Sequence, residues 1–352
     1  MEDLTSSRKK ICLWIIGTLV AMSFLLAGGE LQLAEALPSN KTAFILSQRL
    51  NREGPYVGLV VPNPFEIAPL LSKTVFKPHP YVPWLDLAGR RFHVGTIEGQ
   101  KVVVVMCGLA MLNSGITTQQ LLDFFDVTRV ILFGIAGTTD PNLNIGDTTV
   151  AKYWAHTGLW NWQRYGQGPN DPLSLESSGD YTRKFGYLNI GAYDVPKGTN
   201  LLNNVWYQPE EVYPVTGVPE VRQHVFFLPV DEKLYETAKK LVDLELVSCV
   251  NTTTCLNSKP KVVFGMNGAS ANVFLDNLAY RQFLYYDLNI SLVDMETAAA
   301  ALVCYEANIP FIAFRSLSDL AGGGTGTNQI SIFGDLAAEN AALFVSSFFK
   351  LL

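Results

Sequence analysis

Five apolar, β-rich runs constrain the fold of this 352-residue sequence more than any other feature. They span residues 56–62, 101–108, 129–137, 261–269 and 310–318. Because these runs are continuously apolar and do not alternate, they are typical of strands buried on both faces of a sheet. Helix-like stretches such as 113–125, 232–242 and 294–307 lie between them, as in βαβ units. The pattern predicts an α/β fold in which helices cover a central sheet.

The alternation of predicted strands and helices is interrupted at about residues 153–226, where tryptophans and tyrosines occur among Gly, Pro and Asn. A stretch this rich in aromatic residues does not have the composition of a disordered linker. We interpret it as an insertion packed on a single domain that spans residues 45–352. The alternative is a second small domain, although no flexible linker is visible at either end.

The N-terminus has the three-part layout of a secretory signal. Basic residues at 8–10 precede the apolar run 11–29, and an A-x-A segment follows at 34–36. Residues 1–36 are therefore predicted to be a signal peptide. The alternative is a retained signal anchor, because the apolar run approaches the lower limit of a membrane span. No second run of that length follows, so no membrane partner is expected once the signal is removed.

Export would expose the chain to glycosylation and to an oxidising compartment. N-x-S/T sites occur at Asn40, Asn251 and Asn289. Cys249 and Cys255 bracket a short polar segment, and we predict that they form a disulfide. The expected location is the secretory pathway, with the vacuole or the extracellular space as its end point.

Charge and composition exclude two classes of function. The net charge is −6, and no Lys/Arg cluster follows a periodic segment, so we expect no nucleic-acid partner. The four histidines are scattered without metal-ligand spacing, so we expect no metal, and nothing in the sequence indicates a cofactor. Cys107 and Cys304 stand in apolar contexts and are predicted to be buried thiols.

Acidic residues stand among apolar ones near the ends of the predicted strands. Glu66 follows the first strand, Glu296 begins a helix, and Asp319 ends the last strand. Burying a carboxylate costs several kcal/mol unless the group is paired or used. Because loops from several strands converge at one edge of such a sheet, we expect these three acids to meet in one pocket. Asp294 has no evident chemistry and is predicted to be a surface or capping acid.

Two long segments carry a family resemblance. The segment FGIAGTTDPNLNIGDTTV, residues 133–150, resembles the G-x-A-G and GD motifs of the purine nucleoside phosphorylase and uridine phosphorylase superfamily. The segment at 293–319 is similar to its M-E-x-A-A and R-x-x-S-D motifs. The resemblance runs from Tyr56 to Leu352 apart from the insertion. It is greatest to methylthioadenosine/S-adenosylhomocysteine nucleosidases, and the signal peptide and insertion resemble plant vegetative and bark storage proteins.

The resemblance implies a three-layer, nucleoside-phosphorylase-like fold with a mixed central sheet, a purine nucleoside as partner and a homodimer. It also implies roles at the base and the sugar. Asp319 would protonate the leaving purine, with Ser318 beside it. Glu296 would accept hydrogen bonds from the ribose hydroxyls, and Met295 would pack against the sugar. Such groups suit a reaction in which positive charge builds on the sugar while the base leaves.

Glu66 separates hydrolysis from phosphorolysis, because it falls where the nucleosidases carry the glutamate that activates water. The phosphorylases place a Gly-rich turn and an arginine near this strand, and the sequence PNPFE at 62–66 contains neither. The segment that holds the base departs from the nucleosidase pattern, and Phe274 is the candidate aromatic residue there. Gly108, after the second strand, is a candidate substrate contact.

Three functions follow from these observations. The first is a purine nucleoside N-ribosyl hydrolase that uses an activated water, and such a protein can also serve as a nitrogen reserve. The second is a catalytically inactive vegetative or bark storage protein, and the third is a nucleoside phosphorylase. Retention of Glu66, Glu296 and Asp319 favours an enzyme, because a pure reserve has no physical need for three acids in one cleft.

Overall fold

The computed structural model describes residues 39–72, 75–163, 170–171, 173, 184–188, 205–215, 217–324 and 326–352. The predicted signal peptide, residues 1–36, lies outside the described residues. So do several segments of the predicted insertion.

A mixed sheet of 13 strands forms the centre of the protein. Its middle strands are parallel neighbours: β5 (Gln100–Met106), β1 (Tyr56–Val61), β6 (Val127–Thr138) and β18 (Phe311–Asp319). Every residue of β1 and of β18 is buried, as their continuous apolar sequences predict. Antiparallel pairing of β4 (Arg90–Ile97) with β5 makes the sheet mixed.

Shorter strands extend the sheet on both sides of this centre. Beyond β4 lie β2 (Phe76–Pro78) and β3 (Trp84–Leu87). On the other side lie β17 (Leu292–Asp294), β16 (Asn267–Ser270), β8 (Tyr153–His156) and β14 (Phe227–Pro229). β7 (Thr148–Val150) pairs with β18 and with β15 (Val262–Phe264).

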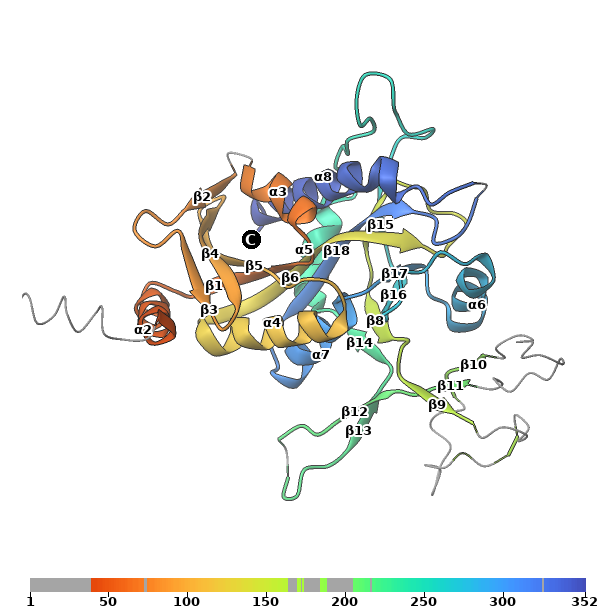
Figure 1. Ribbon diagram of the computed structural model, residues 1–352, viewed down its shortest axis with the longest axis horizontal. Coiled ribbons are helices and arrows are strands. Elements are labelled where there is room, and N and C mark those ends of the chain that lie inside the picture. Colours follow the sequence, from red (N-terminus) through yellow and green to blue (C-terminus); the bar gives the residue numbers. More distant parts are fainter. Residues whose placement is uncertain are drawn as a thin grey trace, which may run out of the picture.

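Helices cover both faces of the sheet, which gives the three-layer α/β fold expected from the resemblance (Figure 1). α3 (Pro64–Ser72) and α8 (Ile330–Phe349) lie together on one face, and α4 (Met111–Phe124) and α7 (Thr297–Glu306) lie together on the other. The other helices in the described part of the chain are α2 (Ser39–Asn51), α5 (Glu232–Ala238), the 3₁₀ turn η1 (Lys239–Leu241) and α6 (Leu278–Leu288).

α8 is apolar because it packs on the buried strand β18. The ring of Phe314 lies 4.7 Å from that of Phe344 and 4.9 Å from that of Phe348. Within the described part of the chain, α8 is the one helix long and apolar enough to cross a membrane, and 67% of its apolar window is buried inside the protein. Its composition is therefore that of a core helix.

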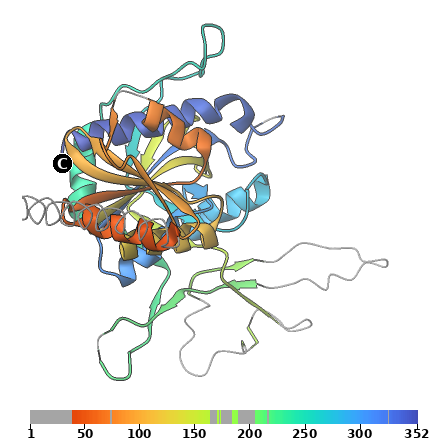
Figure 2. The same cartoon turned by 60° about the vertical axis from the view of Figure 1, so that its left-hand side comes forward.

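The insertion leaves the main sheet at β8 and returns at β14, and these two strands pair with each other. Its described part forms two small sheets that extend from the body (Figure 2). One contains β9 (Trp160–Trp162), β10 (Tyr187–Leu188) and β11 (Val205–Tyr207), and the other pairs β12 (Glu210–Val212) with β13 (Gln223–Val225).

The predicted disulfide and two of the three predicted glycosylation sites lie on loops or at a helix end. Cys249 and Cys255 are joined in a disulfide, while Cys107 and Cys304 are buried free thiols. The side chain of Asn251 is exposed inside the disulfide loop, and the exposed Asn289 ends α6 in the left-handed conformation. Asn40 lies in the first turn of α2. Glycosylation of the three asparagines stays a prediction.

Intact-mass analysis of protein from a eukaryotic secretory host tests these expectations together. We expect a mature chain that begins at or just after Ala36, a mass loss on enzymatic removal of N-glycans, and a gain of 2 hydrogens when the disulfide is reduced. A mass that retains residues 1–36 would support the signal anchor, and an unchanged mass after glycan removal would show that the three asparagines are unmodified.

Candidate active site

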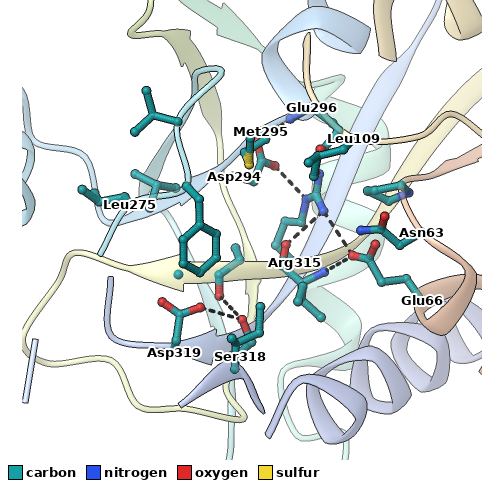
Figure 3. Close-up of a pocket in the computed structure, with 18 of the residues that line it drawn as sticks. Asn63, Glu66, Leu109, Leu275, Asp294, Met295, Glu296, Arg315, Ser318 and Asp319 are labelled. Atoms are coloured by element: carbon teal, nitrogen blue, oxygen red, sulfur yellow. Dashed lines mark hydrogen bonds and ion pairs between the residues drawn. The ribbon is translucent and has the colours of Figure 1, made fainter. Parts of the chain in front are cut away.

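A pocket opens where the strands of the central sheet end. The space it encloses, including the open mouth, is about 640 Å³. The lining residues come from seven stretches of the chain and are Pro62, Asn63, Phe65, Glu66, Leu109, Ile135, Ala136, Gly137, Val273, Phe274, Leu275, Val293, Asp294, Met295, Glu296, Arg315, Ser318, Asp319 and Ile330. Figure 3 shows Glu66, Glu296 and Asp319 around this pocket, as the sequence predicted.

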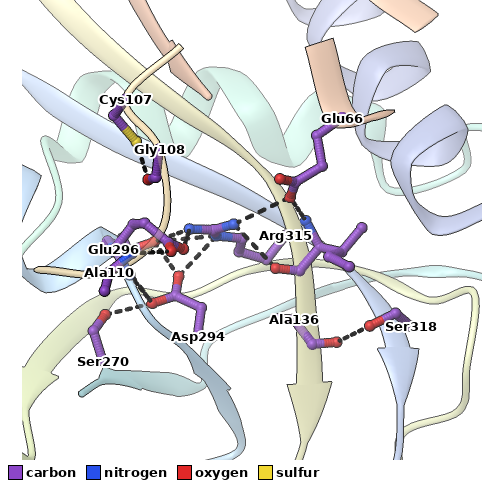
Figure 4. Close-up of polar contacts among 12 residues, drawn as sticks. Glu66, Cys107, Gly108, Ala110, Ala136, Ser270, Asp294, Glu296, Arg315 and Ser318 are labelled. Carbon is purple, nitrogen blue, oxygen red and sulfur yellow. Dashed lines mark hydrogen bonds and ion pairs between the residues drawn. The ribbon is translucent and has the colours of Figure 1, made fainter. Parts of the chain in front are cut away.

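A fully buried arginine, Arg315 of β18, organises the acids (Figure 4). Its Nε lies 2.7 Å from Asp294 Oδ2, and one terminal nitrogen lies 3.2 Å from Glu296 Oε2. The other terminal nitrogen lies 3.7 Å from Glu66 Oε1 and donates to the carbonyl of Ile135 at 3.0 Å. One guanidinium thus faces three carboxylates, which leaves the cluster negative when all three are ionised.

Asp294 was predicted to be a surface or capping acid; the surface alternative is wrong, and the capping alternative is the one that the contacts bear out. Asp294 is buried, and Arg315 supplies the charge partner that makes this burial tolerable. It also caps α7, because its Oδ1 accepts the backbone N–H groups of Glu296 and Thr297 at 3.1 Å. Ser270 Oγ donates to the same oxygen at 2.5 Å. Asp294 therefore fixes the start of the helix that presents Glu296.

Glu296 projects into the pocket from the N-terminus of α7. Its Oε1 accepts the backbone N–H of Ala110 at 2.9 Å, and its Oε2 accepts from Arg315. Burial raises the pKa of Glu296, while Arg315 opposes this effect. Met295 lines the pocket beside it. A carboxylate with both oxygens held in place has fixed acceptor directions toward any ligand in the pocket.

Glu66 sits in the first turn of α3 and is only 1% exposed. Its Oε1 accepts the backbone N–H of Ile135 at 2.8 Å, and its Oε2 makes no hydrogen bond of ordinary geometry to the protein. Burial raises the pKa of Glu66 to about 7, although Arg315, the Ile135 N–H and the side chain of Asn63 all act to lower it. A carboxyl group that titrates near neutrality is suited to take up and return a proton.

Asp319 ends β18 and is also buried. Ser318 Oγ donates to its Oδ2 at 2.8 Å, and the backbone N–H of Ala321 donates to its Oδ1 at 2.8 Å. Asn328 Nδ2 lies 3.4 Å from the same Oδ1. These donors fix the side chain so that it borders the pocket next to Ser318 (Figure 3).

Of the predicted substrate contacts Phe274 and Gly108, the first lies in the pocket and the second does not. Phe274 lines the pocket and is 54% exposed, so its ring is available to a ligand. Gly108 does not line the pocket, and Leu109 does. The reason is that Gly108 forms a turn with a φ of +87° and donates its N–H to the carbonyl of Pro62, which holds it against the end of β1.

The glycines of the G-x-A-G motif make room for the acids. A Cβ at Gly134 would overlap Glu66 Oε1 and lie 2.6 Å from a terminal nitrogen of Arg315, and a Cβ at Gly137 would lie 2.9 Å from Asp319 Oδ1. Any side chain at Gly134 or Gly137 would therefore collide with the buried acids or with Arg315, which explains why glycine stands at both positions.

Replacing Gly134 by Ala is expected to destabilise the protein by about 1–3 kcal/mol, because the buried Glu66 and Arg315 must shift to admit a methyl group. Urea titration of the variant measures this loss. Gly99→Ala is the matched control, since Gly99 has open space around it but a φ of +84°, so only its backbone strain contributes. A Gly134→Ala variant as stable as the wild type would contradict the close approach.

Sequence reasoning left Arg315 and Asn63 without roles, and both line the pocket. The signal for Arg315 was present, because a single arginine inside an otherwise apolar strand needs buried partners. No group of three His, Cys, Asp or Glu residues capable of holding a metal occurs among the residues that the structure describes.

Residues 56–350 match the Phosphorylase superfamily, and the chain belongs to this family. It is 31% identical to bark storage protein A of Populus deltoides, over 83% of this chain and 87% of that protein. It is 24% identical to 5′-methylthioadenosine/S-adenosylhomocysteine nucleosidase of Mycobacterium bovis, over 72% and 83% of the two chains. The fold matches futalosine hydrolase of Helicobacter pylori with a TM-score of 0.58 at 20% identity, over 86% of this chain and 100% of that structure.

Proposed function

We propose that this protein is a purine nucleoside N-ribosyl hydrolase that uses a water activated by Glu66. The observation that carries the proposal is the buried Glu66 carboxyl group, which lines the pocket beside Asn63 and whose Oε2 makes no hydrogen bond of ordinary geometry to the protein. A water bound there would satisfy this oxygen and stand ready to lose a proton to it. The nucleosidase similarity supports the same reaction class.

The chemistry divides between the two ends of the pocket. Asp319 gives a proton to a ring nitrogen of the leaving purine as the bond between the base and the sugar breaks. Water forms the new carbon–oxygen bond at the same sugar carbon, and its proton passes to Glu66. Glu296 accepts hydrogen bonds from the ribose hydroxyls, and its negative charge stabilises the positive charge that develops on the sugar.

The charge of the pocket favours hydrolysis over phosphorolysis. Arg315 is already engaged by Asp294, Glu296 and Glu66, so its charge is not available to a phosphate. An ionised carboxylate repels a single negative charge about 4 Å away by roughly 1–4 kcal/mol. A phosphate anion would therefore bind poorly beside Glu66 once this carboxyl group is ionised, above about pH 7.

Storage is the second candidate function, because bark storage protein A is 31% identical to this chain. Export through the predicted signal peptide, and accumulation in the vacuole or outside the cell, would fit such a role. The two functions are compatible, since a protein that accumulates as a reserve can retain a working site. The paired and capped acids of the pocket support retained activity.

The proposal is tested with a panel of purine and pyrimidine nucleosides, incubated with and without phosphate, while chromatography follows the base and the sugar. We expect purine nucleosides to release base at the same rate in both buffers and to give the free sugar. A sugar 1-phosphate formed only with phosphate would make the protein a phosphorylase. If no base is released, storage remains as the function of this protein. Light scattering on the same sample tests the predicted homodimer.

A further inference from the structure

The described part of the insertion docks on α6 through three aromatic rings. Tyr207 of β11 is fully buried, and its ring stacks on that of Phe283 at 5.9 Å. The ring of Tyr280 stacks on Phe283 at 6.1 Å. The hydroxyls of Tyr207 and Tyr280 are 2.6 Å apart, so one donates a hydrogen bond to the other. Burial raises the pKa of both tyrosines, which keeps both hydroxyls neutral.

α6 in turn holds the loop that forms one wall of the pocket. Val273, Phe274 and Leu275 of this loop line the pocket. Asn277 then caps α6, because its Oδ1 accepts the backbone N–H of Tyr280 at 2.9 Å. Tyr280 therefore has two contacts: its hydroxyl meets Tyr207 of the insertion, and its backbone N–H is held by Asn277 at the end of the pocket loop.

A second hydrophobic cluster, separate from the main core, joins the insertion to the pocket loop and to the segment that follows Asp319. Its buried members are Ala155, Tyr207, Phe226, Ala269, Leu275, Leu284, Leu288, Ile290 and Ala321. Leu275 belongs to the pocket wall, and Ala321 donates its N–H to Asp319. The cluster that contains Tyr207 thus includes one residue of the pocket loop and one residue that holds Asp319.

The pocket loop and the acid are also tied directly. Asn328 Nδ2 lies 3.1 Å from Asp276 Oδ1 and 3.4 Å from Asp319 Oδ1. Gly322, with a φ of +89°, lies against the backbone of Asp276 and leaves no room there for a Cβ. The loop 272–277 and the segment after Asp319 therefore form one packed unit.

We propose that Tyr207 and Tyr280 are positioning residues for the base end of the pocket, through which the insertion sets how tightly the protein holds a purine. Neither tyrosine lines the pocket, so both act through the loop 272–277. The inference rests on the proposed function, because it assumes that the purine lies between Phe274 and Asp319. Asp319 keeps its contacts with Ser318 and Ala321 when the tyrosine pair is broken, so the proton-transfer step should change little.

The test uses Tyr207→Phe and Tyr280→Phe, which keep the rings and remove one hydroxyl each. Calorimetric titration with adenine gives the Kd, and turnover of a purine nucleoside gives KM and kcat. We expect each variant to raise Kd and KM by about 3- to 10-fold, in the range of one lost buried hydrogen bond, with kcat within about twofold of the wild type. The double variant should add little, because each single change breaks the same bond.

Tyr213→Phe is the matched control, since this tyrosine lies next to β12 in the same insertion and is 52% exposed. Its Kd and KM should equal those of the wild type. A role in folding alone would lower the active fraction or the Tm and leave Kd and KM unchanged, and that result in both variants would overturn the inference. If the wild type binds adenine and hydrolyses a purine nucleoside, unchanged Kd and KM in the variants refute only the positioning role of the two tyrosines. If the wild type does neither, both the proposed function and this inference are refuted.

Discussion

Replacing Asp319 by Asn is expected to lower kcat by about two to four orders of magnitude, the usual contribution of a positioned acid. Asparagine can still accept the N–H of Ala321 and can donate to Ser318 Oγ, so the local structure should survive. It cannot deliver a proton to the leaving purine. The loss should therefore fall on the chemical step and leave binding of a purine nucleoside largely intact.

Single-turnover kinetics and calorimetry on this variant separate the two effects. Asp335→Asn is the control, because it makes the same change on the exposed side of α8. An Asp319→Asn variant that keeps the wild-type kcat would remove Asp319 from the mechanism. A variant that loses both binding and turnover would point to a structural role.

Replacing Glu66 by Gln is expected to lower hydrolysis by a similar two to four orders of magnitude, because no group then takes the proton from water. The same change should stabilise the fold above neutral pH. The pKa of Glu66 is raised from an ordinary 4.5 to about 7. The folded state therefore holds the proton more tightly than the unfolded state, and the stability that this contributes is lost as the pH rises from about 4.5 through 7.

Glutamine stays neutral and avoids that loss. Glu66→Gln should gain roughly 3 kcal/mol of unfolding free energy relative to the wild type between pH 4 and pH 8. Urea titrations at the two pH values measure the change, with the exposed Glu306→Gln as control. Wild-type turnover should rise as the pH passes about 7, because the base must be ionised. Equal pH dependence of stability in Glu66→Gln and the wild type would show that Glu66 is not held protonated by burial.

The central sheet was predictable because its strands are continuously apolar, and β1 and β18 are buried along their whole length. The meeting of Glu66, Glu296 and Asp319 followed from the convergence of strand ends. The burial of Asp294 was not foreseen, because it depends on Arg315, 21 positions away in the sequence and adjacent only after folding.

The contacts of the insertion escaped prediction for a different reason. Its aromatic residues show no helical or strand period, so they indicated burial without indicating a partner. The contact of Tyr207 with Tyr280 joins residues 73 positions apart. Such pairings depend on tertiary packing, which local sequence patterns do not encode.

Base release in phosphate-free buffer, by the wild type and by a Glu66→Gln/Asp319→Asn double variant, tests most directly whether this protein hydrolyses purine nucleosides. We predict many turnovers per molecule of wild-type protein, with free sugar as the second product, and no release above background by the double variant. A wild-type protein that binds adenine yet releases no more base than the double variant would contradict the hydrolase and leave a storage protein that keeps the fold and the pocket.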